Sequence, residues 1–426
     1  MSIFSLSRTT LVFALVGVSL SALAQSKYTE PYPEAKSKKG LQVEMVDDAF
    51  ALGVKHAAIN INLSQLVRLQ PADGPSITLD GRKYHFSQTY IEHIDRQVKP
   101  LSDRGVVVNL IALVYANTPE VNRVMLHPKY DPEAPNRLGA FNTGTDEGRG
   151  WFVATLKFIA ERWSRPDQKH GRGAGYIMGN EVNSHWFWSN MGRVSMKEFA
   201  DDYLRIVRLA HRTIREISSW ARVYVSLEHH WNIRYPGGDE RQAFAARPFL
   251  EYFASRARAE GDFDWHVAFH PYPENLFEPR FWKDKSALED PESPRVTFKN
   301  LGVLVDFLGD EPLLYKAKRR RIILSEQGFH TPKGADGEKI QAAAYCYAYR
   351  LVEKYDAIDS FILHRHVDHP KEGGLLLGLR GLHSKGGDKK KIWECFRVAD
   401  TPDWRKSFDF ALSVTGLTSW DDLERP

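Results

Sequence analysis

Two glutamates occupy equivalent places in this sequence, each directly after a short run that predicts a buried strand. Glu181 follows residues 174–178 in the segment Gly-Asn-Glu-Val-Asn, and Glu326 follows residues 321–325 in Leu-Ser-Glu-Gln-Gly-Phe. Both carboxylates are therefore expected where a strand opens into a loop. Glycoside hydrolysis needs such a pair, because one carboxyl group protonates the leaving oxygen while the other attacks or stabilises the sugar cation. A rigid scaffold must then hold the two acids a fixed distance apart.

The elements that would form this scaffold alternate between short β-branched runs and long helical stripes. That alternation is typical of a parallel sheet covered by helices. One stripe ends just before a predicted strand and has apolar residues at helical spacing, at Tyr90, Ile94, Val98 and Leu101. Seven strands are predicted at 56–63, 106–114, 174–178, 222–227, 265–269, 321–325 and 359–363, and a short one near 40–43 makes eight. The prediction is an α/β fold, a (β/α)8 TIM barrel with a short or irregular first strand and long loops at its C-terminal face.

The active site of such a barrel lies at the C-terminal ends of its strands, and chemically useful residues of this sequence collect there. Tryptophan rings stack on pyranose faces, although core packing is the rival interpretation for each of them. A long segment rich in Asn, Pro and Gly, 115–150, is expected to cover one side of the cleft. The predicted substrate-binding residues are Asn180, His185, Trp186 and Trp188 after the fourth strand, Glu228, His229 and Trp231 after the fifth, His270 and Tyr272 after the sixth, and His364 after the eighth.

The order and placement of these motifs resemble the clan A glycoside hydrolases, whose barrels carry an Asn-Glu pair after strand four and a nucleophilic glutamate after strand seven. The matching residues are Asn180-Glu181 and Glu326. The resemblance implies that Glu181 is the general acid/base and Glu326 the nucleophile, with retention of configuration. It also implies that Asn180 donates to the sugar 2-hydroxyl and that Tyr272 hydrogen-bonds the nucleophile. The resemblance covers most of residues 41–400, although no arginine-bearing motif follows the second strand.

Several segments, among them Gly-Asn-Glu-Val-Asn-Ser-His-Trp, are similar to a group of exported bacterial barrel proteins of unassigned function. Export is also expected from the first residues, where Arg8 precedes an apolar run at 11–20 and a small-x-small cleavage site at 22–24. The run is too short to span a membrane. We therefore expect a signal peptide at 1–24, a periplasmic or secreted mature chain, an N-terminal arm at 25–40 and one catalytic barrel at 41–426.

The 426-residue chain has a formal net charge of +4, with basic runs at 318–321 and 389–391. Such runs more often mark solvated turns than a nucleic-acid site, so no nucleic-acid partner is predicted. Because guanidinium groups match carboxylate and sulfate geometry, Arg365 and Arg380 keep an anionic glycan among the candidate substrates. The two cysteines, Cys346 and Cys395, lie in predicted C-terminal helices, and both a single disulfide and two separate buried thiols remain open.

Two other function classes stay open. A metal-dependent hydrolase would use the His229-His230 pair with three further groups near the eighth strand, His364-x-His366, Asp368 and His369. A carbohydrate-binding barrel without turnover would keep the fold and lose the reaction. The favoured prediction is a carbohydrate-cleaving enzyme without a metal or cofactor, its oligomeric state left open.

Overall fold

The computed structural model describes residues 27–382 and 387–423, and its centre is a closed barrel of parallel strands. The strands pair in the order β2-β1-β12-β11-β10-β9-β8-β6, and β2 pairs with β6 to close the ring. This arrangement confirms the (β/α)8 barrel. Each strand agrees with a predicted run to within about two residues, as given by β1 (Lys39–Gln42), β2 (His56–Asn62), β6 (Val107–Tyr115), β8 (Gly173–Met178), β9 (Arg222–Glu228), β10 (Trp265–His270), β11 (Ile322–Gln327) and β12 (Ile358–Leu363).

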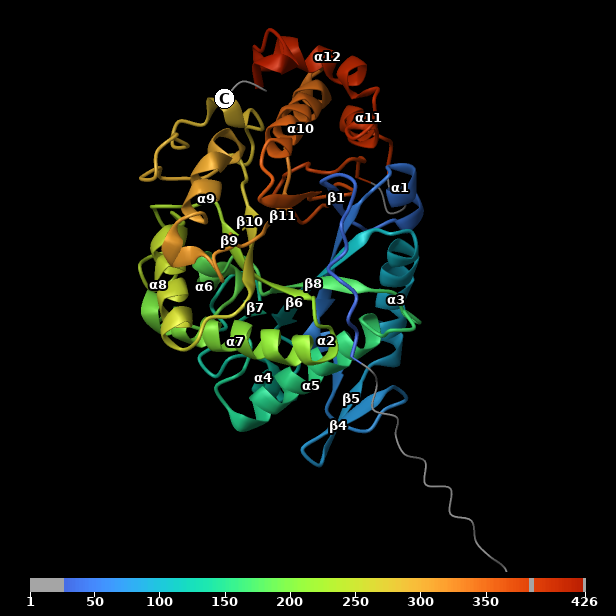
Figure 1. Cartoon of the computed structure of the whole chain (residues 1–426), viewed down its shortest axis with the longest axis vertical. Helices are drawn as coiled ribbons and strands as arrows, with labels where there is room; N and C mark the ends of the chain where they lie inside the picture. Colours follow the sequence, from blue (N-terminus) through green and yellow to red (C-terminus); the bar gives the residue numbers. More distant parts are fainter. Residues whose placement is uncertain (1–26, 383–386, 424–426) are drawn as a thin grey trace, which may run out of the picture.

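A ring of helices surrounds the barrel (Figure 1). The apolar stripe predicted for α3 is buried at Ile94, Val98 and Leu101, and the Ser195 hydroxyl at the start of α7 accepts the Glu198 amide at 3.3 Å, as the capping signal predicts. The main helices are α1 (Val46–Ala51), α3 (Gln88–Asp103), α5 (Asp146–Trp163), α7 (Met196–Ile217), α8 (Ala246–Ala259), α9 (Leu301–Phe307), α10 (Gly337–Glu353), α11 (Lys391–Val398) and α12 (Trp404–Thr415).

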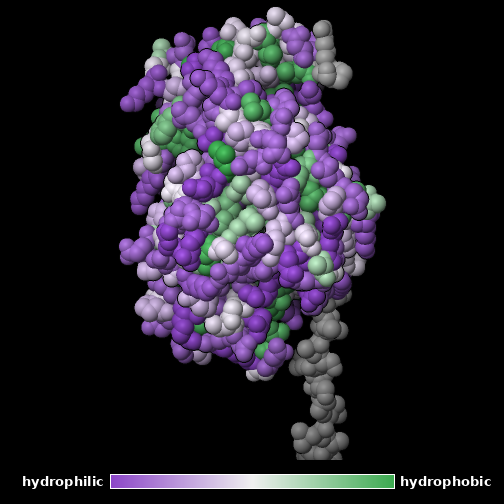
Figure 2. Space-filling model, turned by 90° about the vertical axis from the view of Figure 1, so that its left-hand side faces the viewer, coloured by the Kyte–Doolittle hydropathy of each residue, from purple (hydrophilic) through white to green (hydrophobic). Residues whose placement is uncertain are grey.

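The core has two parts, because alternate residues of each strand face opposite sides. The larger part lies between the strands and the helices. The smaller part fills the barrel itself, and Tyr115 and Trp188 pack against it. Its buried members come mainly from the barrel strands: Ala58, Ile111, Leu113, Leu138, Ile177, Tyr224, Ala268, Ile323 and Ile362. The outer surface over α8 and α9 is mainly hydrophilic, with apolar residues in small separate groups (Figure 2).

The N-terminal arm closes the end of the barrel where the strands begin. The Tyr28 amide donates to the Ile217 carbonyl at 2.7 Å. The Tyr32 hydroxyl lies 3.3 Å from Asn109 Oδ1 and 3.2 Å from the Tyr224 hydroxyl, so this ring fills the barrel floor. The predicted signal peptide, 1–24, lies outside the described residues. Within 27–382 and 387–423, no helix combines the length and apolarity needed to cross a membrane.

Regular structure replaces much of the long loop predicted at 115–150. It contains α4 (Pro119–Met125) and β7 (Leu138–Gly139), and β7 pairs antiparallel with the end of β6. A small antiparallel sheet that the sequence did not reveal precedes α3, formed by β3 (Val67–Arg68), β4 (Ser76–Leu79) and β5 (Arg82–Phe86). The cysteines are free buried thiols on α10 and α11.

Candidate active site

Glu181 follows strand β8 on a backbone conformation that few non-glycine residues adopt. Gly179 has φ of +77° and Glu181 has φ of +40° with ψ of +52°. The Glu181 amide donates to Ser226 Oγ on β9 at 3.1 Å, which fixes the turn. A left-handed non-glycine residue costs free energy and persists only where surrounding contacts enforce it. The turn brings the Glu181 carboxyl group, 12% exposed, to the C-terminal mouth of the barrel.

Glu326 approaches Glu181 from strand β11. Glu181, Glu326 and His270, the last residue of β10, each present one atom within 4.8 Å of the others. A Glu181 carboxylate oxygen and a Glu326 carboxylate oxygen are therefore no more than 4.8 Å apart. This gap is close to the roughly 5–5.5 Å between carboxyl groups of retaining glycosidases and well below the roughly 6.5–9.5 Å of inverting ones.

His270 is the hydrogen-bond partner of Glu181. Its Nδ1 lies 2.9 Å from Glu181 Oε1, and its Nε2 lies 3.0 Å from Ser325 Oγ. Burial raises the pKa of Glu181 above the ordinary value, and the His270 hydrogen bond offsets only part of that rise. Burial acts to lower the pKa of His270, but the Glu181 hydrogen bond and the charge of Glu326 raise it overall. The pair therefore retains a proton to higher pH than an isolated glutamate does.

Glu326 has the opposite electrostatic environment. Burial acts to raise its pKa, but the charges of His364 and His270 and a hydrogen bond from Gln42 lower it below the ordinary value. Gln42 Nε2 donates to Glu326 Oε2 at 3.1 Å, and the Tyr272 hydroxyl donates to Oε1 at 3.4 Å. Burial raises the pKa of Tyr272 well above its usual value, so its phenol stays a donor. The environment thus lowers the pKa of Glu326 while burial raises that of Glu181.

A chain of side chains orients Gln42. Its Oε1 lies 2.8 Å from His364 Nδ1, and His364 Nε2 lies 3.1 Å from Glu372 Oε2. Arg365 donates to the other Glu372 oxygen at 3.1 Å. The sequence did not reveal Gln42, although its place at the end of the short first strand is a strand-end position like that of Glu181. His364, predicted as a substrate ligand, uses both ring nitrogens on protein partners.

Glu228 is a buried structural carboxylate beside the site. It is 3% exposed, and its oxygens accept hydrogen bonds from Asn183 Nδ2 at 2.7 Å, Ser184 Oγ at 2.8 Å and His230 at 2.6 Å. Burial acts to raise its pKa, but the hydrogen bonds of His230 and the charges of His230 and His229 lower it to about 2. His229, 8% exposed, is also buried. The partners of Glu228 are in the protein, so this carboxylate holds the loop that follows Glu181, whereas the buried Nδ1 of His229 has no hydrogen-bond partner within the described residues.

His185 lies in the core, away from the cleft where it was predicted to bind substrate. It is fully buried, and its ring packs 4.6 Å from Phe199 and 5.0 Å from Phe244, measured between centroids. Its Nε2 lies 3.1 Å from the Arg241 carbonyl. Burial lowers its pKa to about 3, which keeps the imidazole neutral. The ring faces the helix layer and anchors the loop.

Trp231 also differs from its predicted role. It is fully buried and meets Phe269 and Phe307 edge to face at centroid distances of 6.4 and 5.0 Å. Of the two tryptophans on α6 (His185–Trp188), Trp186 is 9% exposed, whereas Trp188 is half-buried and packs on the apolar filling of the barrel. The structure therefore leaves Trp188 as the predicted ring best placed to face a sugar, and Asn180 is half-buried next to Glu181.

Two tyrosines that were not predicted lie close to the acids. Burial and the charge of Glu326 raise the pKa of Tyr115, at the end of β6. Burial and the charge of Glu181 raise that of Tyr235, whose ring lies 4.7 Å from Phe187 between centroids. A cleft of about 1200 Å³ opens beside Tyr115 and runs past Asn60 along the start of α3. The strand-end position of Tyr115 is visible in the sequence, whereas Tyr235 comes from a loop.

The histidines near the eighth strand do not assemble into a metal centre in the described part of the chain. His366 Nε2 lies 2.9 Å from Asp48 Oδ2 and its Nδ1 accepts backbone amides, while Asp368 accepts Lys390 at 2.9 Å. The donor groups that do cluster within 4.8 Å among these residues are Glu181-His270-Glu326 and Glu228-His229-His230. In the second group, Glu228 already has protein donors on both oxygens.

The arginines suggested as ligands for an anionic sugar are paired with carboxylates. Arg365 contacts Glu44 and Glu372, at 2.9 and 3.1 Å. Arg380 contacts both oxygens of Asp48, with the shorter distance 2.6 Å. Their charges are therefore largely used within the protein.

Solved structures with a similar fold include several glycosidases. A family 39 glycoside hydrolase from Bacteroides cellulosilyticus WH2 matches with a TM-score of 0.54 and 14% identity over 84% of this chain and 60% of that one. A β-glucosidase from Pyrococcus furiosus has a TM-score of 0.54 and 16% identity over 87% and 86% of the two chains. A glucosidase from Croceicoccus marinus has a TM-score of 0.50 and 12% identity over 88% and 69%. At such identities the likeness establishes the barrel fold.

No curated protein sequence matches the chain. A family match spans residues 31–423 and so contains every barrel strand together with both glutamates. It agrees with the resemblance to barrel proteins of unassigned function. The chain belongs to DUF5722, a family of unknown function.

Proposed function

We propose that this protein is a retaining glycoside hydrolase that cleaves O-glycosidic bonds of a polysaccharide or oligosaccharide. The observation that carries the proposal is the pair of glutamates with oxygens no more than 4.8 Å apart and pKa values shifted in opposite directions. Two carboxyl groups in unlike environments divide the acid and the nucleophilic roles between them. The glycosidases among the similar folds support the same substrate class.

In the first step, Glu326 attacks the anomeric carbon and Glu181 gives its proton to the leaving oxygen, so one C–O bond breaks as an ester bond forms. Burial favours the protonated form of Glu181, and Gln42 and Tyr272 hold the Glu326 carboxylate in one orientation. In the second step, Glu181 removes a proton from water, which attacks the same carbon and releases Glu326. Two inversions give net retention.

A glycan longer than one sugar would extend from the acids into the cleft of about 1200 Å³ that Tyr115 and Asn60 line, although neither acid lines that cleft itself. Trp188 offers a flat surface for one ring. Asn180, next to the acid, would donate to the 2-hydroxyl. The chain would act outside the cytoplasm once residues 1–24 are removed, which N-terminal sequencing of the secreted protein would test.

The decisive experiment measures new reducing ends from a panel of neutral and acidic glycans with the wild type, Glu181→Gln and Glu326→Gln. Circular dichroism checks folding, and Glu216→Gln, an exposed glutamate on α7, is the matched control. We expect cleavage by the wild type and the control only, with the first product formed in the anomeric configuration of the substrate by NMR. Full activity of either folded site variant would refute its role, and an inverted first product would refute the double displacement.

A glycan that binds but stays intact would favour a binding protein without turnover. Activity lost with a chelator and restored by zinc would favour the metal-dependent alternative, for which Glu228-His229-His230 is the donor cluster to mutate.

A further inference from the structure

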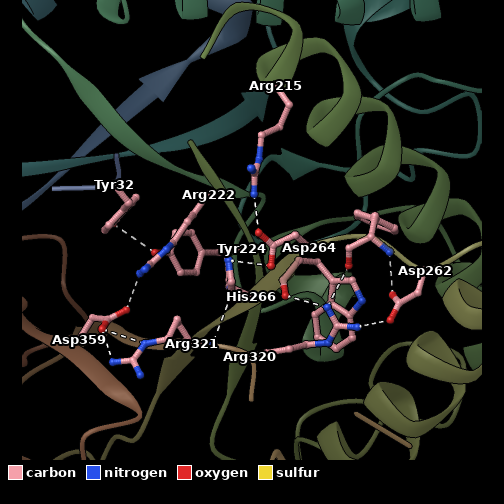
Figure 3. Close-up of polar contacts among 12 residues, drawn as sticks. Tyr32, Arg215, Arg222, Tyr224, Asp262, Asp264, His266, Arg320, Arg321 and Asp359 are labelled. Carbon is pink, nitrogen blue, oxygen red and sulfur yellow. Dashed lines mark hydrogen bonds and ion pairs between the residues drawn. The ribbon is translucent and has the colours of Figure 1, made fainter. Parts of the chain in front are cut away.

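A second pocket lies at the opposite end of the barrel, where the strands begin. It has a volume of about 600 Å³ and lies between the starts of β9, β10 and β11, the end of α7 and the segment 315–321. Eight of its lining residues are lysine or arginine, two are histidine and one is acidic. Figure 3 shows its polar contacts, in which Arg222 and Arg321 both reach Asp359 and Arg215 reaches Asp264. The pocket shares no lining residue with the candidate active site.

The ion pairs of this face leave part of its positive charge unpaired. Arg222 and Arg321 share the single carboxylate of Asp359. Lys316, Lys318 and Arg319 are exposed, and the ion pairs found among the described residues include none of the three. The pocket therefore offers positive charge that an anion from solution can meet.

A tight turn holds two of these cations in place. Tyr315 and Lys318 exchange two backbone hydrogen bonds, at 2.9 and 3.0 Å. Lys316 and Ala317, between them, have φ of +49° and +59°, the backbone of a two-residue hairpin turn. A preorganised turn loses less conformational freedom when its side chains bind a ligand.

A buried donor without a partner also faces this pocket. His266 is 5% exposed, and its Nδ1 accepts the Arg321 amide at 3.1 Å, so its Nε2 carries the hydrogen. Nε2 lies 3.5 Å from Asp264 Oδ1 and makes no hydrogen bond within the described residues. The buried Nε of Arg215 is likewise without a partner there. Unpaired buried donors are costly, and an acceptor oxygen of a ligand would satisfy them.

The pocket also contains an exposed aromatic ring. Trp220, which lies between α7 and β9, is 53% exposed. An indole ring is flat and apolar, with one polar edge, and suits the face of a pyranose. A flat ring beside guanidinium and ammonium groups matches a sugar that carries a carboxylate or a sulfate.

We propose that this pocket, lined by Trp220, His266, Lys316, Lys318 and Arg319, is a second binding site for an anionic polysaccharide. The choice of a glycan rests on the proposed function, whereas the anion chemistry rests on the pocket alone. The site would hold a uronate or sulfated chain at the N-terminal face while the carboxylates at the other end act on the chain.

The test is a calorimetric titration of the mature chain carrying Glu181→Gln and Glu326→Gln, so that no ligand is cleaved. The probes are an oligogalacturonate, a chondroitin sulfate oligosaccharide and a cello-oligosaccharide of equal length. Into this background go the triple change Lys316→Ser, Lys318→Ser, Arg319→Ser and, separately, Trp220→Ala. The matched control removes the same charge at exposed lysines elsewhere, with Lys83→Ser, Lys197→Ser and Lys406→Ser.

We expect an acidic probe to bind more tightly than the neutral one, with affinity falling as salt rises. The triple change and Trp220→Ala should each weaken binding about tenfold, and the charge control by less than about twofold. Equal affinity of the triple variant and its parent, or equal loss in the charge control, would overturn the proposal. Tighter binding to vesicles containing phosphatidylglycerol than to either acidic probe would overturn the glycan assignment.

Hydrolysis by the wild type is measured separately. An inactive wild type whose parent variant binds an acidic probe through Trp220 and the 316–319 turn would refute the proposed reaction and support this site. An active wild type whose parent variant shows no such binding would support the proposed reaction and refute this second site.

Discussion

The two ends of this barrel use charged side chains in opposite ways. At the C-terminal end, no lysine or arginine of the described residues is bound to Glu181 or Glu326, which lie close together; burial raises the pKa of Glu181, whereas His364, His270 and Gln42 lower that of Glu326. At the N-terminal end, arginines such as Arg320 meet carboxylates directly. The comparison teaches that one end keeps its carboxylates reactive while the other uses them to hold the strands together.

The largest effect should come from the nucleophile. Glu326→Gln removes the attacking oxygen while keeping the hydrogen-bonding shape, so kcat/KM should fall at least about a thousandfold. Thermal unfolding should change little, because the change also removes a partly buried charge. If Glu326→Gln instead lowers Tm, and loses activity only because the protein unfolds, the carboxylate would serve stability rather than the reaction. That result would contradict the difference proposed between the two ends of the barrel.

At the N-terminal end of the barrel, removal of a carboxylate should lower the stability of the fold. Asp262 Oδ2 accepts Arg320 Nη2 at 2.6 Å, and the Arg320 side chain is 1% exposed. Asp262→Ala leaves a buried guanidinium group without its carboxylate and should lower the free energy of unfolding by about 3 kcal/mol. Denaturant unfolding measures this, and kcat should stay unchanged. The control is Asp310→Ala, at an exposed position on the same side. An equal fall in the free energy of unfolding in this control would contradict the structural role of Asp262.

Gln42 tests whether orientation matters at the reactive end. Gln42→Ala removes the donor to Glu326 and unlinks it from His364. A lost hydrogen bond to a charged group should cost about tenfold in kcat, since such bonds contribute about 1.5–3 kcal/mol to stability. The rising limb of the pH profile should move to higher pH, because the Gln42 hydrogen bond lowers the pKa of Glu326. An unchanged pH profile would show that Gln42 does not affect the pKa of Glu326 and only packs beside it.

The smallest effect is a shift of the pH profile in His270→Asn. Activity requires Glu326 ionised and Glu181 protonated, so the wild type should show a bell-shaped profile. His270 lowers the pKa of both glutamates, and its removal should raise both. Both limbs should therefore move to higher pH in kcat/KM measured on the best glycan. Limbs that move in opposite directions would contradict the prediction that His270 lowers the pKa of both glutamates.

The barrel was predictable because each strand is a short buried run between amphipathic helices. The acids were also predictable as candidates, since Glu181 and Glu326 stand at strand ends. The sequence could not show whether a ring that follows a strand faces the cleft or the helix layer. His185 and Trp231 follow strands just as Trp188 does, yet they face the helix layer. Gln42 was missed because its strand has four residues and gives little signal.

The left-handed backbone at Glu181 has a consequence for sequence variation. A glycine would adopt φ of +40° without strain and should make the folded protein more stable by about 1 kcal/mol. It would also delete the acid. Family members with glycine or asparagine at this position would thus have a more stable fold and no activity. The residue at this position would separate active enzymes from family members that have kept the barrel fold without the reaction.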